Sequence, residues 1–218
     1  MMTPVDEVRR RYLQAVLDGR RRDAFAAFDA AVDEGLGIGP LYLEVLQPVM
    51  REIGRLWQEN RITVADEHLA TAITQAAMAR LYDRLFRGEG AAGPLLIAAC
   101  ADQERHELGL RMICDLLEME GWDTVFLGAS VPVDDLVAMV VARRPAAVAL
   151  SAAITPHLAR VREAVGAIRR AVPGDGPVIM VGGRAFADDP ALGDRLGADL
   201  TARDAVEAAT RLKERFAA

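Results

Sequence analysis

The alternation of short apolar runs with amphipathic segments after residue 94 constrains the fold more than any other feature of the chain. Five apolar runs typical of buried strands lie at 95–100, 124–129, 147–154, 178–183 and 198–202. A segment with helical periodicity follows each run. Strands that alternate with helices form a parallel sheet covered on both faces. The sequence therefore predicts an α/β domain with a five-stranded parallel sheet over residues 94–218.

The preceding residues have a different pattern, in which apolar side chains recur at helical spacing. Helices are predicted at 5–17, 22–34, 41–58 and from about Thr63 to about Phe86. Pro48 is expected to kink the third helix, and Thr63 followed by Asp66 resembles a capping box at the start of the fourth. Short loops between these helices favour a four-helix bundle over residues 1–87. The glycine-rich stretch 88–93 is predicted to be a linker.

Composition narrows the functional classes. A net charge of −6 and a pI near 5.2 argue against a nucleic-acid-binding domain, so no direct DNA binding is expected. No apolar run reaches the roughly 20 residues that span a bilayer, and the start of the chain does not resemble a signal peptide. Cys100 and Cys114 lie in apolar surroundings typical of reduced core thiols. A cytoplasmic protein without membrane contact is therefore expected.

Polar and glycine residues follow three of the predicted strands. The first strand is followed by Glu104, His106 and Gly109 in an E-x-H-x-x-G spacing, the third by the segment Ser151–Thr155, and the fourth by the pair Gly182 and Gly183. In a doubly wound, flavodoxin-like (Rossmann-like) fold these loops lie at the same edge of the sheet, where ligands bind. The groups are therefore expected to converge on one ligand.

Each of these groups also has a simpler interpretation. His106 could be a surface histidine, Ser151 a hydroxyl that ends a strand, and the glycine pair a turn. In the functional interpretation, Glu104 accepts a hydrogen bond from one ring nitrogen of His106 and leaves the other as a metal ligand. Gly109 would then let a bulky ligand approach the backbone. The joint order and spacing of the three groups favour the functional interpretation.

Together these residues resemble the cobalamin-binding module of methionine synthase and related corrinoid proteins. That family has D-x-H-x-x-G after strand one, S-x-L with a nearby Thr after strand three, and G-G after strand four. The resemblance implies that His106 replaces the benzimidazole base of the cofactor as the lower cobalt ligand, with Glu104 as its hydrogen-bond partner. The other contacts that it implies to cobalamin or its nucleotide tail are Arg105, Leu108, Gly109, Ser151, Ala153, Thr155, Gly182 and Gly183.

This chain departs from the module at two motif positions. Glu104 stands where the family has Asp, and Ala153 stands where it has Leu. Neither change removes a ligand. Other proteins of this fold fit less well, because a phosphoacceptor receiver needs an Asp after strand three and a flavodoxin needs a hydroxyl-rich phosphate loop after strand one. Cobalamin is therefore the expected cofactor.

The predicted bundle contains a second pattern, Trp57 followed by Glu67 and His68 in a W-x9-E-H spacing. The simpler interpretation is a core tryptophan and a polar pair at a helix start. The spacing resembles that of CarH-type cobalamin photoreceptors, in which the bundle caps the upper corrin face and recognises a 5′-deoxyadenosyl group. An indole gives a flat stacking surface, and a carboxylate accepts hydrogen bonds from ribose hydroxyls. The resemblance implies that Trp57, Glu67 and His68 contact the adenosyl group.

Two departures from the CarH-type pattern affect the functional prediction. Gln58 stands where those photoreceptors have a histidine that binds cobalt after illumination, so another ligand, such as water or His68, is expected there. Only about four residues precede the first predicted helix, so no DNA-binding domain is expected at the start of this sequence. His157, after Pro156, is interpreted as a structural residue or one next to the nucleotide tail.

The leading hypothesis is an adenosylcobalamin-binding photosensory or regulatory protein that is not an enzyme. It would bind the cofactor in the base-off, His-on form. Light would then change the assembly of the protein as a homo-oligomer or its binding to an unidentified protein effector. Transcription regulation is one such role. Methyl- or hydroxocobalamin are alternative cofactor forms. A corrinoid methyl carrier for a methyltransferase system is the second hypothesis, and a cobalamin storage or delivery protein the third. A mutase is disfavoured, because 218 residues leave no room for a catalytic barrel.

Overall fold

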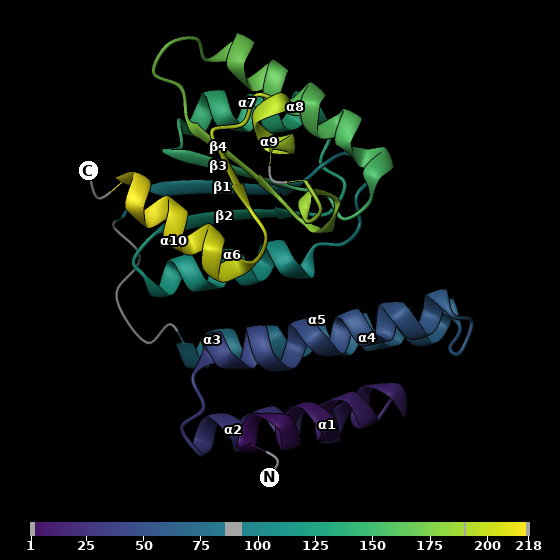
Figure 1. Ribbon diagram of the computed structural model, residues 1–218. Coiled ribbons are helices and arrows are strands. Elements are labelled where there is room, and N and C mark those ends of the chain that lie inside the picture. The colour runs from purple at the N-terminus through teal and green to yellow at the C-terminus, as the bar shows by residue number, and fades with distance from the viewer. Residues whose placement is uncertain (1–2, 86–92, 190, 217–218) are drawn as a thin grey trace. The chain divides into compact units, whose positions relative to one another are not determined.

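A computed structural model describes residues 3–85, 93–189 and 191–216 (Figure 1). The chain divides into two compact units, Met1–Arg87 and Gly88–Ala218. The predicted linker at 88–93 lies outside the described residues except for Gly93, as does Phe86, the predicted last residue of the fourth helix. Within the described ranges, no helix is long and apolar enough to cross a membrane.

The N-terminal unit is helical, as predicted. Its elements are α1 (Pro4–Leu17), α2 (Arg21–Asp33), α3 (Ile38–Pro40), a π-helix (Leu41–Leu46), α4 (Gln47–Gln58) and α5 (Val64–Leu85). Tyr12 and Phe28 stack in its core with ring centroids 4.2 Å apart, and the Tyr12 hydroxyl lies 2.9 Å from the hydroxyl of Thr74. These contacts join α1, α2 and α5 into one packed layer of buried apolar residues.

The predicted third helix differs from the observed one in its start and in its form. It begins at Ile38 rather than Leu41, and a π-helix of six residues, Leu41–Leu46, lies shortly before Pro48. Proline has no backbone N–H, so the carbonyl of Glu44 loses its α-helical partner. That carbonyl accepts a hydrogen bond from the Arg9 guanidinium at 3.2 Å.

The start of α5 follows the predicted capping box. The Thr63 hydroxyl accepts from the Asp66 backbone N–H at 3.2 Å, and the Asp66 carboxylate accepts from the Thr63 backbone N–H at 2.8 Å. This reciprocal pair satisfies two donors at the helix terminus. It fixes where α5 begins, and so fixes the positions of Glu67 and His68 in the first turns of the helix.

The C-terminal unit is a five-stranded parallel sheet with strand order β2-β1-β3-β4-β5, which confirms the predicted fold. The strands are β1 (Leu95–Cys100), β2 (Asp123–Gly128), β3 (Ala147–Ser151), β4 (Val178–Gly182) and β5 (Leu200–Ala202). The helices are α6 (Leu108–Met119), α7 (Val133–Arg143), α8 (Leu158–Ala171), α9 (Leu192–Arg195) and α10 (Ala205–Phe216). Two 3₁₀ turns, Thr155–His157 and Arg184–Phe186, follow β3 and β4.

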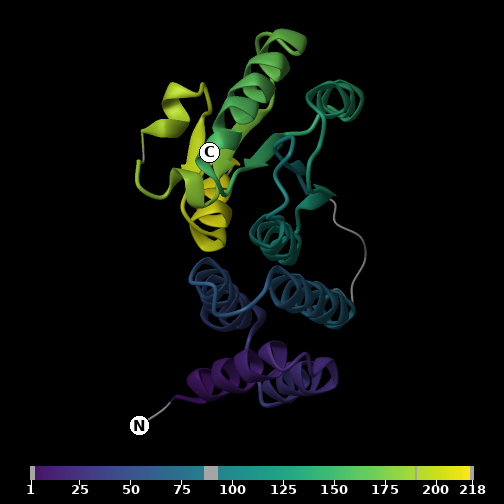
Figure 2. The same cartoon turned by 90° about the vertical axis from the view of Figure 1, so that its right-hand side faces the viewer.

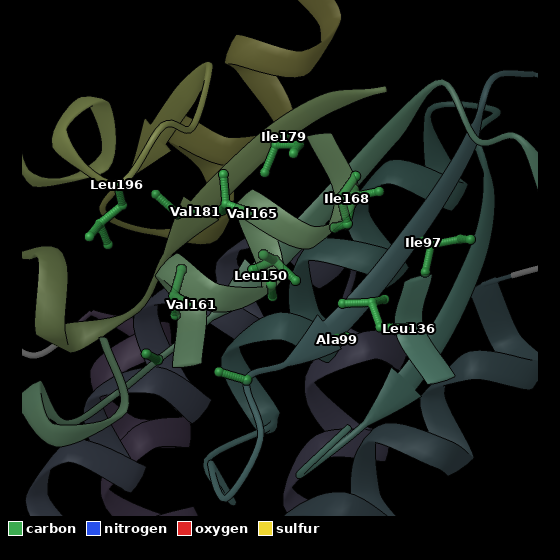
Figure 3. Close-up of a cluster of buried hydrophobic side chains, with 14 of the residues drawn as sticks. Ile97, Ala99, Leu136, Leu150, Val161, Val165, Ile168, Ile179, Val181 and Leu196 are labelled. Atoms are coloured by element: carbon green, nitrogen blue, oxygen red, sulfur yellow. The ribbon is translucent and has the colours of Figure 1, made fainter. Parts of the chain in front are cut away.

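Both faces of the sheet are covered by helices, with α7 and α8 on one face and α6 and α10 on the other (Figures 1 and 2). Alternate residues of each strand enter the two cores. Ile97 and Ala99 pack with Leu136 of α7 and with Val161 and other apolar residues of α8 (Figure 3). The intervening residues of β1, Leu96, Ala98 and Cys100, pack with α6 and α10. The alternation in β1 thus explains why its whole sequence is apolar.

Both cysteines are buried, and neither forms a disulfide. Burial, with the neighbouring charges of Glu104 and Glu107, raises the pKa of the Cys100 thiol to about 12. Burial also raises the pKa of Cys114. Only the thiolate reacts readily with a disulfide reagent. We therefore expect both thiols to be unreactive towards a chromogenic disulfide reagent at pH 8 in the native protein and to react fully in denaturant. Rapid reaction of either thiol without denaturant would contradict the burial of that side chain.

Candidate functional site

The candidate site lies where the chain changes direction across the sheet. The chain leaves β1 for β2 on one side and returns to β3 on the other, so β1 and β3 form the topological switch point. The last residues of neighbouring strands are in register, with Cys100 opposite Ser151 and Ser151 opposite Gly182. The loops that follow β1, β3 and β4 therefore start at one level along this edge of the sheet, as predicted.

Glu104 joins the loops that follow β1 and β3. Its side chain is completely buried. One carboxylate oxygen, Oε1, accepts from the backbone N–H of His106 at 2.9 Å and faces the His106 ring Nδ1 at 2.5 Å. The other oxygen, Oε2, accepts from the Ala153 backbone N–H at 2.7 Å and faces the His157 ring Nδ1 at 2.9 Å. One carboxylate thus contacts two imidazoles and two backbone amides.

The burial of Glu104 and its four contacts determine the charge of its carboxyl group. Burial alone would raise its pKa, but the hydrogen bonds from His106, His157 and Ala153 together hold the pKa of the carboxyl well below its usual range. An ionised carboxylate can only accept hydrogen bonds, so the ring Nδ1 atoms that face it must donate. In the neutral form of the His106 ring the proton is then on Nδ1, and Nε2 is the nitrogen that has the lone pair.

The His106 side chain is 63% exposed, in contrast to its buried partner. Ser130, in the loop after β2, holds the loop that contains His106. The Ser130 backbone N–H donates to the Glu104 carbonyl at 2.8 Å, and the Ser130 hydroxyl accepts from the Gln103 N–H at 3.0 Å. Gln103 and Ser130 both have positive φ, 69° and 52°. Such backbone strain at non-glycine residues gathers at functional sites. The exposed imidazole is thus held by a constrained loop.

The glycine pair after β4 has a role in the fold itself. Gly183 has φ 101° and ψ 172°, a conformation essentially restricted to glycine. A Cβ there would lie 2.3 Å from the Ala152 carbonyl oxygen, and a Cβ at Gly182 would lie 2.8 Å from that of Ala202. The close approach of neighbouring strand ends therefore requires both glycines, whatever ligand binds nearby.

The remaining predicted site residues of this unit lie at the same edge. Arg105 and Gly109 are exposed and Leu108 is half-buried at the start of α6. A Cβ added to Gly109 would meet nothing within 4 Å, so the space above this helix start is open. Ser151 ends β3, Ala153 follows it, and exposed Thr155 opens the 3₁₀ turn before α8. The arrangement offers one exposed, carboxylate-held imidazole, which is chemistry suited to a metal ligand.

The N-terminal unit contains the second predicted set. Trp57, near the end of α4, is 45% exposed, and adjacent Gln58 is also exposed. The His68 ring is 71% exposed and its Nδ1 lies 2.6 Å from Glu67 Oε2, while Glu67 Oε1 accepts from the Thr71 hydroxyl at 3.0 Å. Exposed Val64 and Leu69 lie beside this pair in the first turns of α5. The tryptophan is thus a surface residue of this unit rather than a core residue.

Two contacts at the Glu104 carboxylate were not predicted from the sequence. The resemblance implies that Ala153 contacts cobalamin or its nucleotide tail, and the structure shows in addition that its backbone N–H donates to Glu104. His157 was interpreted as structural or tail-adjacent, and the structure places its ring on Glu104. The only available signal was its position, six residues after the strand-end Ser151 and directly after a proline.

A helical unit followed by a parallel α/β unit, with a carboxylate-held histidine after the first strand, defines the class of cobalamin-binding proteins. The chain belongs to the B12 binding domain family, which it matches over residues 94–210, and a second B12 binding domain family matches residues 8–82. The match over 94–210 contains His106 and its partners, and the match over 8–82 contains Trp57, Glu67 and His68. The chain is therefore a cobalamin-binding protein.

Similar proteins fall into two groups. The HTH-type transcriptional repressor CarH of Myxococcus xanthus is 33% identical over 153 residues, which are 70% of this chain and 50% of that protein. CarA of the same organism is 38% identical over 106 residues, 49% of this chain and 34% of that protein. The chain thus spans half or less of these two relatives. The dimethylamine corrinoid protein 1 of Methanosarcina acetivorans is 22% identical over 204 residues, 93% of this chain and 94% of that protein.

The solved structure of the monomethylamine corrinoid protein of Methanosarcina barkeri shares the fold, with a TM-score of 0.83 and 22% identity. The match covers 96% of this chain and 99% of that chain. At this level of identity the similarity concerns the fold alone.

Proposed function

We propose that this chain is an adenosylcobalamin-binding sensor that regulates a partner or its own assembly and catalyses no reaction. His106 Nε2 would be the lower cobalt ligand in a base-off, His-on complex, with Glu104 holding the ring through Nδ1. The motif residues after β1, β3 and β4 would surround the cofactor and its nucleotide tail. A protein of this kind needs one oriented imidazole for the metal, and the Glu104–His106 pair has that form.

The observation that supports the sensor over other cobalamin proteins is the surface of the N-terminal unit around Trp57. Trp57, Val64 and Leu69 are large apolar side chains that are each more than 40% exposed. Half-buried Glu67 and exposed His68 lie among them in the sequence. An apolar surface with a few oriented polar groups suits a nucleoside. We propose that Trp57, Glu67 and His68 contact the adenosyl group and that this unit caps the upper corrin face.

Light is the proposed signal. Bound adenosylcobalamin would supply a light-sensitive cobalt–carbon bond, and release of the adenosyl group would remove the contacts of Trp57, Glu67 and His68 with it. When contacts that exist in only one of two conformations are lost, the population shifts towards the other conformation. Exposed Gln58, a weak cobalt ligand, distinguishes this chain from photoreceptors that use a histidine at that position.

Reconstitution with adenosylcobalamin in darkness, followed by illumination, tests the sensor. We expect the absorbance of the bound cofactor and the oligomeric size of the protein to change together, with a methylcobalamin-loaded sample as the control. A protein that binds adenosylcobalamin but does not change in size or partner binding after illumination would contradict the sensor proposal.

Trp57→Ala is expected to reduce discrimination between cobalamin forms. The indole would add stacking area for the adenine but not for a methyl group, so adenosylcobalamin affinity should fall by about 10-fold while methylcobalamin affinity changes little. Titrations of both forms, followed by absorbance, measure this. Because Trp57 is half-exposed, stability should change little, and Val141→Ala provides a control at an exposed apolar residue of α7, outside the proposed surface. Equal losses for both forms would mean that Trp57 does not read the adenosyl group.

A corrinoid methyl carrier is the second candidate, favoured by the similarity to the dimethylamine corrinoid protein over 94% of that protein's length. A carrier would exchange a methyl group with a methyltransferase and would bind methylcobalamin at least as well as adenosylcobalamin. Transfer of isotope-labelled methyl between the loaded protein and a methyltransferase would favour this role.

A further inference from the structure

Gln103 lies in the loop that presents His106, in a backbone conformation that a residue with a side chain rarely adopts. Its φ is 69°, in the left-handed region. Glycine visits this region routinely and asparagine and aspartate do so occasionally, but glutamine is not one of these types. Gln103 directly precedes Glu104, the buried partner of His106. The loop therefore has a residue of high backbone energy at a position where glycine would form the same turn.

The fold uses the backbone of Gln103 and not its side chain. The Gln103 N–H donates to the Ser130 hydroxyl at 3.0 Å, a contact that glycine would also make. The side chain is exposed, and among the described residues it has no hydrogen-bond partner. Ser130 differs, because its own φ is 52° but its hydroxyl is the acceptor in this contact. The contacts between described residues thus explain the Gln103 backbone and leave its amide group unused.

The positive φ values of two other residues have local explanations. Arg144, with φ 46°, is the C-cap of α7, and Asn60, with φ 56°, follows the C-cap of α4. Helices commonly end in the left-handed conformation, and asparagine tolerates it. Gln103 ends no helix, since it lies in the loop between β1 and α6. A left-handed residue with an unused polar side chain is thus found at the candidate site.

The chemistry of the amide indicates a ligand group of the same kind. A primary amide offers N–H donors and a carbonyl acceptor. Cobalamin has primary amides on the side chains around the edge of its corrin ring, and two such amides can pair through reciprocal hydrogen bonds. We propose that Gln103 is a cofactor-binding residue whose side-chain amide pairs with a corrin amide. This inference rests on the proposed cobalamin site at His106 and adds a contact to the edge of the ring.

Gln103→Gly separates the amide from the loop. Glycine adopts a φ of 69° readily and keeps the N–H that donates to Ser130, so the denaturation midpoint of the apoprotein should stay the same or rise slightly. Cobalamin affinity should nevertheless fall by about 3–10-fold, as expected when one or two hydrogen bonds are lost. Arg144→Gly changes a residue with a similar φ at the end of α7 and is the matched control, with unchanged affinity.

The lower ligand should be unaffected by this change. With cob(II)alamin bound, the electron paramagnetic resonance spectrum shows nitrogen splitting from an axial nitrogen ligand. We expect Gln103→Gly to keep this splitting, because His106 and its Glu104 partner remain in place. Weaker binding with the splitting retained is the result of a lost corrin contact. Undiminished affinity, or weaker binding in which the splitting is also lost, would overturn the proposal.

A charged replacement tests the pairing directly. Cobalamin monocarboxylic acids, in which one corrin amide has been hydrolysed to a carboxylate, can be separated as isomers. We expect one isomer to bind the wild type about 3–10-fold more weakly than cobalamin, because the amide pair is lost. Gln103→Lys should restore the binding of that isomer through a charge-assisted hydrogen bond and should change the others much less.

A Gln103→Lys protein that favours no isomer would overturn the proposal, also in the case that Gln103→Gly does not fold. The failure of the proposed function gives a different result. A wild-type protein that binds no cobalamin would overturn the proposed function and this inference with it, whereas equal cobalamin binding by the wild type and Gln103→Gly would overturn this inference alone.

Discussion

His106→Ala is expected to remove the axial nitrogen from bound cobalamin and to weaken binding by about 100-fold or more. This loss is larger than the loss of about 10–100-fold that is typical when a group that only orients a metal ligand is changed. The reason is that the two imidazoles that contact Glu104 differ in exposure, and only that of His106 is open to a ligand. His157, the other imidazole on this carboxylate, is largely enclosed and faces Glu104 through Nδ1, so it is not placed to take over. Cobalamin titration and the nitrogen splitting of the cob(II)alamin spectrum measure the two effects.

The same substitution should destabilise the protein without cofactor by about 1–3 kcal/mol, because the buried carboxylate of Glu104 loses one donor although the His106 ring itself is mostly exposed. Added imidazole provides a control, since it can enter the space left by the ring and restore the nitrogen splitting. Splitting that persists in His106→Ala without imidazole would show that a different group ligates cobalt. An apoprotein of His106→Ala that does not fold at all would contradict the mostly exposed position of the His106 side chain.

The sheet and the order of its loops could be predicted from the sequence because each strand is a short apolar run followed by a helical period. The E-x-H spacing then located His106 after β1, and the parallel arrangement brought Ser151 and Gly182 to the same level. These inferences need only local pattern and the rule that parallel strands end at one edge.

The contact between His157 and Glu104 could not be predicted in this way. It depends on a ring in one loop reaching a carboxylate in another, 53 residues earlier in the sequence, and no periodicity reports such a distance. The π-helix before Pro48 was missed for a different reason. Six residues of π-helix keep the apolar spacing of an α-helix closely enough that the pattern does not distinguish them.

The glycines of the site illustrate how one residue type can be required for two reasons, and two substitutions separate them. Gly183→Ala adds a Cβ at 2.3 Å from the Ala152 carbonyl oxygen and forces φ 101° on a residue with a side chain. The strain and the overlap together should destabilise the apoprotein by about 3 kcal/mol or more. Gly109→Ala adds a Cβ that meets nothing within 4 Å, at a helical position where alanine is favoured.

The stability of the C-terminal unit can be followed through its tryptophan. Trp122 is buried, while Trp57 of the other unit is 45% exposed, so the fluorescence change on unfolding is dominated by the unit that contains the glycines. We expect Gly109→Ala to leave the denaturation midpoint unchanged or slightly raised and yet to weaken cobalamin binding, because its methyl group would occupy the open space at the start of α6. Gly183→Ala should lower the midpoint even without cofactor. A stable Gly183→Ala apoprotein would contradict the backbone geometry after β4, and undiminished cobalamin binding by Gly109→Ala would mean that the corrin does not approach the start of α6.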